Sequence, residues 1–228
     1  MIYSGNDKTG LGEQLEQIDS TTLTELQQRR KLEALRAASL GSLYYLRGFL
    51  DDGDIGVNET LSHAQDTLLI AAAGSWNVEK VAYLLASGAR VNDQNTEGRS
   101  ALIEAARNGS ASVIGTLLTS GARVDLIDKK GRTALMHAAY SGSPEAVELL
   151  LEQGADPSGV SHCGCAVLDY AMQGKMNFEE FLKQEEERIA NGIGDPEYID
   201  FLQSCDGPNH DSVMRMLKKC GKPLKRAA

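Results

Sequence analysis

The chain has 228 residues, a formal net charge of -9 at pH 7 and an aromatic content of 5%. Because phosphate binding needs a net basic surface, this charge argues against nucleic acid as a partner unless a local basic patch exists. No apolar run reaches the roughly 18 residues of a spanning helix, and residues 1–6 lack a basic-then-apolar leader, so we expect a cytoplasmic protein without a membrane segment.

Residues 1–26 are predicted to form a polar N-terminal segment that ends in a capping helix. Thr22 and Glu25 have the spacing of a capping box, and Leu23, Leu26 and Leu32 follow at mostly helical intervals. We expect this leading helix to cover the exposed end of the units that follow.

Two sequence motifs then recur at a spacing of 33 residues. The motif Leu-Leu-x-x-Gly-Ala begins at Leu84, Leu117 and Leu150. Upstream of each copy, a threonine or serine is followed by a leucine and then by a pair of alanines, in segments 67–73, 100–106 and 133–139. Equal spacing of both motifs indicates an internal repeat whose unit is one small supersecondary structure.

This pattern resembles the ankyrin repeat family, whose units of about 33 residues hold two helices and a turn. The resemblance implies an all-α solenoid of about five to six helix-turn-helix units with a leading N-terminal helix and a divergent C-terminal cap. It also implies a protein that binds other proteins and is not an enzyme. Residues 27–160 are assigned to four units, at 27–61, 62–94, 95–127 and 128–160.

Glycines and their replacements indicate where the chain turns within these units. Gly88, Gly121 and Gly154 follow the second helix of their units, where a left-handed residue is needed. In the second unit, Trp76 stands where the family has a glycine between the two helices, and we expect Asn77 to supply the left-handed conformation there.

Residues 161–228 are predicted to hold divergent repeats and a C-terminal cap. A fifth unit begins in register with a first helix near residues 167–172, followed by an overlong second helix near 178–188. Apolar residues at 198–202 and 213–217 predict two final helices, which we interpret as a sixth, capping unit. An irregular insertion within the fifth unit is the alternative. The acidic run at 183–188 is interpreted as a solvated helix face, with a docking site for a basic partner as the alternative.

Catalytic and metal-binding signatures are scarce. The chain has no phosphate-binding loop, nucleophile elbow or HExxH motif, so we predict no enzymatic activity and no cofactor. His162, Cys163 and Cys165, with Cys205 or Cys220, form the one cluster with metal-like chemistry. The CxC spacing is a weak match to a zinc site, so we predict no metal there. A metal- or redox-responsive sensor stays an alternative function.

A local concentration of basic residues contradicts the acidic character of the whole chain. In the ankyrin family, the turn tips and first-helix ends line a concave surface that holds partners. In this sequence, these positions contain Arg99, Arg107, Asn108, Lys129, Lys130, Arg132 and Tyr140. The five cations predict a site for an acidic or mixed-charge segment of another protein, with Tyr140 as a flat anchor. Chance clustering at polar turn tips is the alternative interpretation.

The resemblance leaves the biological setting open. An adaptor, an inhibitor and a targeting protein would all use such a surface. Some ankyrin proteins of intracellular bacteria are delivered into host cells, so a secreted effector that binds host proteins is a further alternative. The identity of the partner would distinguish these roles.

Overall fold

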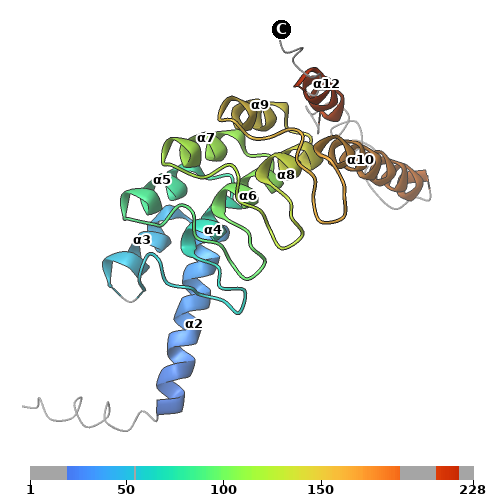
Figure 1. Ribbon diagram of the computed structural model, residues 1–228. Coiled ribbons are helices and arrows are strands. Elements are labelled where there is room, and N and C mark those ends of the chain that lie inside the picture. The colour runs from blue at the N-terminus through green and yellow to red at the C-terminus, as the bar shows by residue number, and fades with distance from the viewer. Residues whose placement is uncertain (1–19, 54, 191–208, 221–228) are drawn as a thin grey trace, which may run out of the picture.

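The computed structural model describes residues 20–53, 55–190 and 209–220, and Figure 1 shows their helices stacked in two rows with loops projecting to one side. The described helices are α2 (Ser20–Ser39), α3 (Leu43–Asp51), α4 (Leu68–Ala73), α5 (Val78–Ala86), α6 (Ala101–Arg107), α7 (Ala111–Thr119), α8 (Ala134–Ser141), α9 (Pro144–Glu152), α10 (Val167–Ala190) and α12 (His210–Cys220). Extended pairing in these ranges is limited to three isolated bridges, at Gln94–Ser100, Ile127–Thr133 and Val160–Ala166. The predicted all-α fold is confirmed.

Two rows of helices build the stack. One row runs from α2 through α4, α6 and α8 to α10, and the other runs from α3 through α5 and α7 to α9, with each helix in contact with the next of its row. In units two to four, the first-row helix begins at a hydroxyl N-cap, because Thr67, Ser100 and Thr133 accept hydrogen bonds from the backbone N–H three residues later, at 3.3, 3.4 and 3.3 Å. The recurring motif thus sets where each helix starts.

The core follows the same repeat. Leu84, Leu117 and Leu150 are each fully buried in the second helix of their units, and the alanine pairs of the first helices are also fully buried. Small alanines let neighbouring helices approach closely, and each buried leucine contributes about 1.5–3 kcal/mol of transfer free energy. The expected left-handed glycines are confirmed, with φ of +89° at Gly88, +85° at Gly121 and +83° at Gly154.

The turn of the second unit differs from the prediction. Trp76 itself has a φ of +52°, whereas Asn77 has a φ of -99° and caps α5 by accepting a hydrogen bond from the Lys80 N–H at 3.0 Å. The expectation that Asn77 is left-handed was wrong, because its side chain is needed as the N-cap and that position requires extended backbone.

The N-terminal boundary also differs. Helix α2 runs without a break from residue 20 to residue 39, through the expected boundary at residue 26. The predicted capping helix and the first helix of the first unit are therefore one helix, whose C-terminal half packs on α4 (Figure 1). A buried lysine fixes its end, because Lys80 Nζ donates to the carbonyl oxygens of Ala38 at 2.6 Å and Gly41 at 3.2 Å.

At the C-terminal end, α10 is one continuous helix where two were predicted, and it packs on α8. Helix α12 contains the predicted segment 213–217 and packs on α8, α9 and α10. The predicted helix at 198–202 lies outside the described residues. None of the helices in the described ranges has an apolar stretch long enough to cross a membrane.

Candidate protein-binding surface

The predicted site residues lie on and beside four loops, the turn row, which we define as residues 61–66, 94–100, 127–133 and 160–166 and which project to the same side in Figure 1. Backbone hydrogen bonds connect each turn to the next. Thr96 N–H donates to Ala64 O at 2.8 Å, Lys129 N–H to Glu97 O at 2.9 Å, and His162 N–H to Lys130 O at 3.0 Å. The tips are therefore held in a fixed relation before any partner arrives.

An acidic or amide side chain shapes each of the two central turns. Asn95 Oδ1 accepts hydrogen bonds from the N–H groups of Glu97 and Arg99, at 3.0 and 2.9 Å. Asp128 Oδ1 repeats this pattern in the next unit, accepting from Lys130 and Arg132 at 2.9 Å each. These internal bonds satisfy backbone donors that would otherwise face solvent and so stabilise the turns.

Arg99 and Arg107 share one carboxylate. Arg99 Nη1 lies 2.6 Å from Glu104 Oε1, and Arg107 Nε lies 3.1 Å from Glu104 Oε2. The Glu104 side chain is only 12% exposed, whereas that of Arg107 is 50% exposed. One buried carboxylate therefore neutralises part of the positive charge that the sequence predicted, and Arg107 keeps one face in solvent.

Arg132 belongs to a buried network with Asp128 and His137. Arg132 donates to Asp128 Oδ2 from Nε at 2.8 Å and from Nη2 at 2.7 Å, and His137 Nε2 lies 3.1 Å from the same oxygen. Burial alone would raise the pKa of Asp128, but the hydrogen bonds from Arg132 and His137 outweigh it and hold that pKa at about 2. Burial lowers the pKa of His137, so its ring is neutral and donates Nε2–H to the carboxylate.

Lys129 and Lys130 differ from the three arginines. Both are exposed at the tip of their turn, and neither ammonium group has an ion-pair partner within the described residues. A charge that has no internal partner is available to an incoming carboxylate at little cost.

Asn108 and Tyr140 have structural partners. Asn108 Nδ2 donates to Gly74 O at 2.8 Å and so connects two units. Tyr140 is 38% exposed, and its Oη accepts a hydrogen bond from Asn177 Nδ2 at 2.9 Å, while its carbonyl accepts one from His210 Nε2 at 3.0 Å. Tyr140 therefore lies beside α10 and α12, at the C-terminal edge of the surface.

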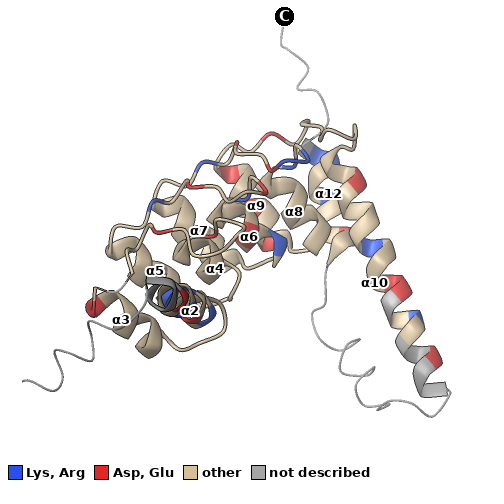
Figure 2. Cartoon of the chain, turned by 90° about the horizontal axis from the view of Figure 1, so that it is seen from below, with Lys and Arg blue, Asp and Glu red and all other residues tan. Residues whose placement is uncertain are grey.

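The structure thus separates the seven predicted residues into paired arginines, unpaired lysines and tethered neutral side chains. Glu104 and Asp128 were missed by the sequence analysis, although Arg107 follows Glu104 by three residues and Arg132 follows Asp128 by four, which are ion-pair spacings. Figure 2 shows blue and red segments interspersed along the loops instead of one continuous blue face.

The two thiols, Cys163 and Cys165, lie in the last turn of this row. Cys163 and Cys165 are free, with Cys163 exposed. The ring of His162 is turned to the neighbouring unit, where Nδ1 lies 3.1 Å from Lys129 O. Across the described part of the chain, no three His, Cys, Asp or Glu side chains gather in a group that could hold a metal ion.

Comparison with known families agrees with this geometry. A family model described as ankyrin repeats (3 copies) matches three overlapping stretches, residues 34–128, 68–161 and 114–189. Together these stretches cover more than half of the chain. No curated protein matches the sequence.

Proposed function

Because this chain belongs to the ankyrin-repeat family, whose members are generally protein–protein interaction modules, we propose that it is a non-enzymatic adaptor, inhibitor or targeting protein. In this proposal, an acidic or mixed-charge segment of another protein binds along the concave face, across the turn row. In this proposal the protein acts in the cytoplasm, where cysteines are ordinarily kept as thiols.

The observation that carries this proposal is a pair of ammonium groups that have no ion-pair partner among the described residues and that lie on a hydrogen-bonded row of turns. Lys129 and Lys130 are exposed, and the backbone beneath them is bonded to Glu97 on one side and His162 on the other. Preorganised turns lose little conformational entropy on binding, so more of the contact energy appears as affinity.

The arginines have a secondary role in this proposal. Arg107 is half exposed, so a partner carboxylate can bind its free N–H groups while Glu104 keeps the other side. Arg99 and Arg132 are less exposed, at 25% and 26%, and their first function is to hold the turns. Their replacement by glutamate would place two carboxylates together and would test folding instead of binding.

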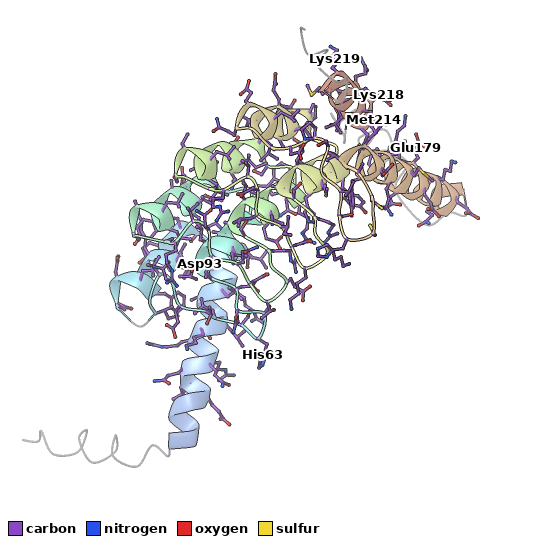
Figure 3. All side chains as sticks on the ribbon, viewed as in Figure 1. His63, Asp93, Glu179, Met214, Lys218 and Lys219 are labelled. Atoms are coloured by element: carbon purple, nitrogen blue, oxygen red, sulfur yellow. The ribbon has the colours of Figure 1, made fainter. Side chains whose placement is uncertain are left out.

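The experiment therefore reverses charge at the lysines. The double variant Lys129→Glu/Lys130→Glu is compared with Lys218→Glu/Lys219→Glu, which makes the same change at two adjacent exposed lysines of α12. Figure 3 shows Lys218 and Lys219 at the opposite end of the molecule from His63, which marks the first tip of the turn row. Circular dichroism of both variants verifies the fold.

Affinity capture from a native lysate is the measurement. We expect one partner to be retained by the wild-type chain and by the α12 variant and to be lost by the Lys129→Glu/Lys130→Glu variant. Equal retention by all three proteins would contradict binding at the turn row.

A further inference from the structure

The last turn of the row holds two thiols close together. Cys163 and Cys165 flank Gly164, which has a φ of +78°, and their Sγ atoms are 3.0 Å apart. The turn is closed on both sides, because Ser161 N–H donates to Cys165 O at 3.0 Å and Gly164 N–H donates to Ser161 O at 2.9 Å. A disulfide has its Sγ atoms about 2.05 Å apart, so these two sulfurs already lie within about 1 Å of bonding distance.

Polar neighbours distinguish the two sulfurs. Ser161 Oγ lies 3.1 Å from Cys163 Sγ, and Tyr170 Oη lies 3.7 Å from it. Tyr170, in α10, also donates to Ser161 Oγ at 3.0 Å. Ser161, in the turn, and Tyr170 therefore lie together beside Cys163. Hydrogen bonds with Cys165 and Ser161 lower the pKa of Cys163 to about 6, whereas the contact with Cys163 raises the pKa of Cys165.

Access matches this difference. Cys163 is exposed and Cys165 is half buried, so a small reagent reaches Cys163 first. A thiolate is the nucleophile in reactions of cysteine, and an exposed thiolate beside a second thiol is the arrangement of cysteines that react with peroxides.

We propose that Cys163 and Cys165 form a peroxide-reactive dithiol, in which Cys163 is the attacking thiolate and Cys165 is the resolving thiol. Cys163 S⁻ attacks one oxygen of hydrogen peroxide, the O–O bond breaks, and the products are a sulfenic acid and hydroxide. The Cys165 sulfur then attacks the Cys163 sulfur, the S–S bond forms, and the S–O bond breaks. The departing hydroxide takes the Cys165 proton and leaves as water, and the hydroxide of the first step takes up the proton that Cys163 released when it became a thiolate. Overall, two thiols and one peroxide give one disulfide and two water molecules, with two electrons passing from sulfur to oxygen.

This site is independent of the proposed partner. His162 connects this turn to the neighbouring turn, because its backbone N–H donates to Lys130 O and its ring Nδ1 lies within hydrogen-bond distance of Lys129 O. The reaction of the two thiols needs neither lysine side chain. The test therefore uses the purified full chain alone, and its failure would leave the binding proposal intact.

The experiment isolates the pair in a full-length background that carries Cys205→Ser and Cys220→Ser. This protein is treated with one equivalent of hydrogen peroxide, and free thiols and intact mass are measured. We expect loss of both thiols and a mass lower by two hydrogen atoms, both reversed by dithiothreitol. Thiols that stay free, or a product that is a disulfide-linked dimer, would overturn the proposal.

Single replacements in the same background assign the roles. With Cys165→Ser, we expect a sulfenic acid at Cys163 that is trapped by dimedone. With Cys163→Ser, we expect Cys165 to be alkylated by iodoacetamide at pH 7 more slowly than Cys163 is in the Cys165→Ser variant, because Cys165 is half buried and Cys163 is exposed. Equal alkylation rates in the two variants would refute the assignment. So would a dimedone-trapped sulfenic acid at Cys165 in the protein that keeps both cysteines. Circular dichroism verifies that both variants are folded.

Discussion

Asp128 shows how one side chain can shape a turn and neutralise its charge. Its Oδ1 atom accepts from two backbone N–H groups, and its Oδ2 atom binds Arg132 and His137. One unit earlier, Asn95 makes the same backbone bonds without a negative charge. The turn therefore needs the oxygen, and only the buried network needs the charge.

Acid sensitivity follows from this network. The pKa of Asp128 is about 2 in the folded protein against 3.8 ordinarily, so its stabilisation is present above pH 3.8 and is lost as the pH falls through about 2. His137 also makes the folded protein less stable in acid. Its pKa is lowered from 6.5 in the folded protein, so as the pH falls the imidazole is protonated in the unfolded chain before it is protonated in the folded one.

The variant Asp128→Asn tests this account, since asparagine keeps the Oδ1 acceptor. We expect a loss of about 1.5–3 kcal/mol at pH 7, as for hydrogen bonds to a charged group, and a smaller loss near pH 2. Urea unfolding at both pH values measures it. Asp125→Asn is the control, because Asp125 is exposed. A loss at Asp128 that does not change with pH would contradict the pKa argument.

Gln65 is a residue whose backbone conformation conflicts with its type. It has a φ of +55° and occupies the position at which the next three units have Gly98, Gly131 and Gly164, all with positive φ. A left-handed conformation costs a residue with a Cβ about 1–2 kcal/mol. The repeat spacing alone could have identified this strain, because the three later glycines are 33 residues apart.

Replacement of Gln65 by glycine is expected to stabilise the protein by up to about 1 kcal/mol, since part of the relieved strain is offset by glycine's chain entropy. Gln65→Ala is the matched control, because it removes the same exposed side chain and keeps the Cβ. In thermal unfolding, the Gln65→Gly variant should have a higher melting temperature than the Gln65→Ala variant. The same melting temperature for both would show that the position is unstrained.

At the scale of helices, the sequence predicted the regular units and missed the two long helices. In units two to four, a left-handed residue (Trp76, Gly109 or Gly142) precedes an N-cap (Asn77, Ser110 or Ser143). The equivalent positions of the fifth unit are Lys175 and Met176, which provide neither signal, and α10 continues through both.

Likewise, no glycine or proline interrupts residues 20–39, so α2 continues as one helix over this range.

Gly174 determines how closely α10 packs on α8. A Cβ at this position would overlap the carbonyl oxygen of Tyr140 and the ring of His210. Gly48 in α3 has the opposite surroundings, because a Cβ there would meet no neighbouring atom within 4 Å. The two glycines therefore form a natural pair, one needed for packing and one not.

Alanine at these two positions should have effects of opposite sign. Gly48→Ala is expected to stabilise the protein by about 0.5–1 kcal/mol through helix propensity. Gly174→Ala has the same propensity gain but forces α10 away from α8, and we expect a net loss of about 1–3 kcal/mol from overpacking. Chemical denaturation measures both. A stabilising Gly174→Ala would show that α10 is not held against α8.

The candidate surface was predicted in part. The repeat register placed Lys129 and Lys130 correctly at an exposed tip, because turn tips are polar in every unit. It did not reveal that Glu104 and Asp128 neutralise the arginines, because side-chain pairing depends on distances that spacing only suggests. Whether these residues bind a partner stays a prediction.

On the scale of the whole molecule, the chain has a net charge of -9, and Lys129 and Lys130 form a small basic tip on it. Long-range repulsion keeps acidic partners away at low ionic strength, whereas contacts at Lys129 and Lys130 attract them locally. Along both rows, each helix packs on the next helix of its row, so a substitution in one turn acts mainly on the adjacent units. The surface can therefore be tested by local substitutions without disturbing the remaining units.

The most direct measurement is the dissociation constant of the captured partner for three proteins: wild type, Lys129→Glu/Lys130→Glu and Lys218→Glu/Lys219→Glu. We predict binding weaker by about tenfold or more for the first variant, which corresponds to about 1.4 kcal/mol, and unchanged for the second. Equal constants for all three proteins would contradict recognition by the turn row.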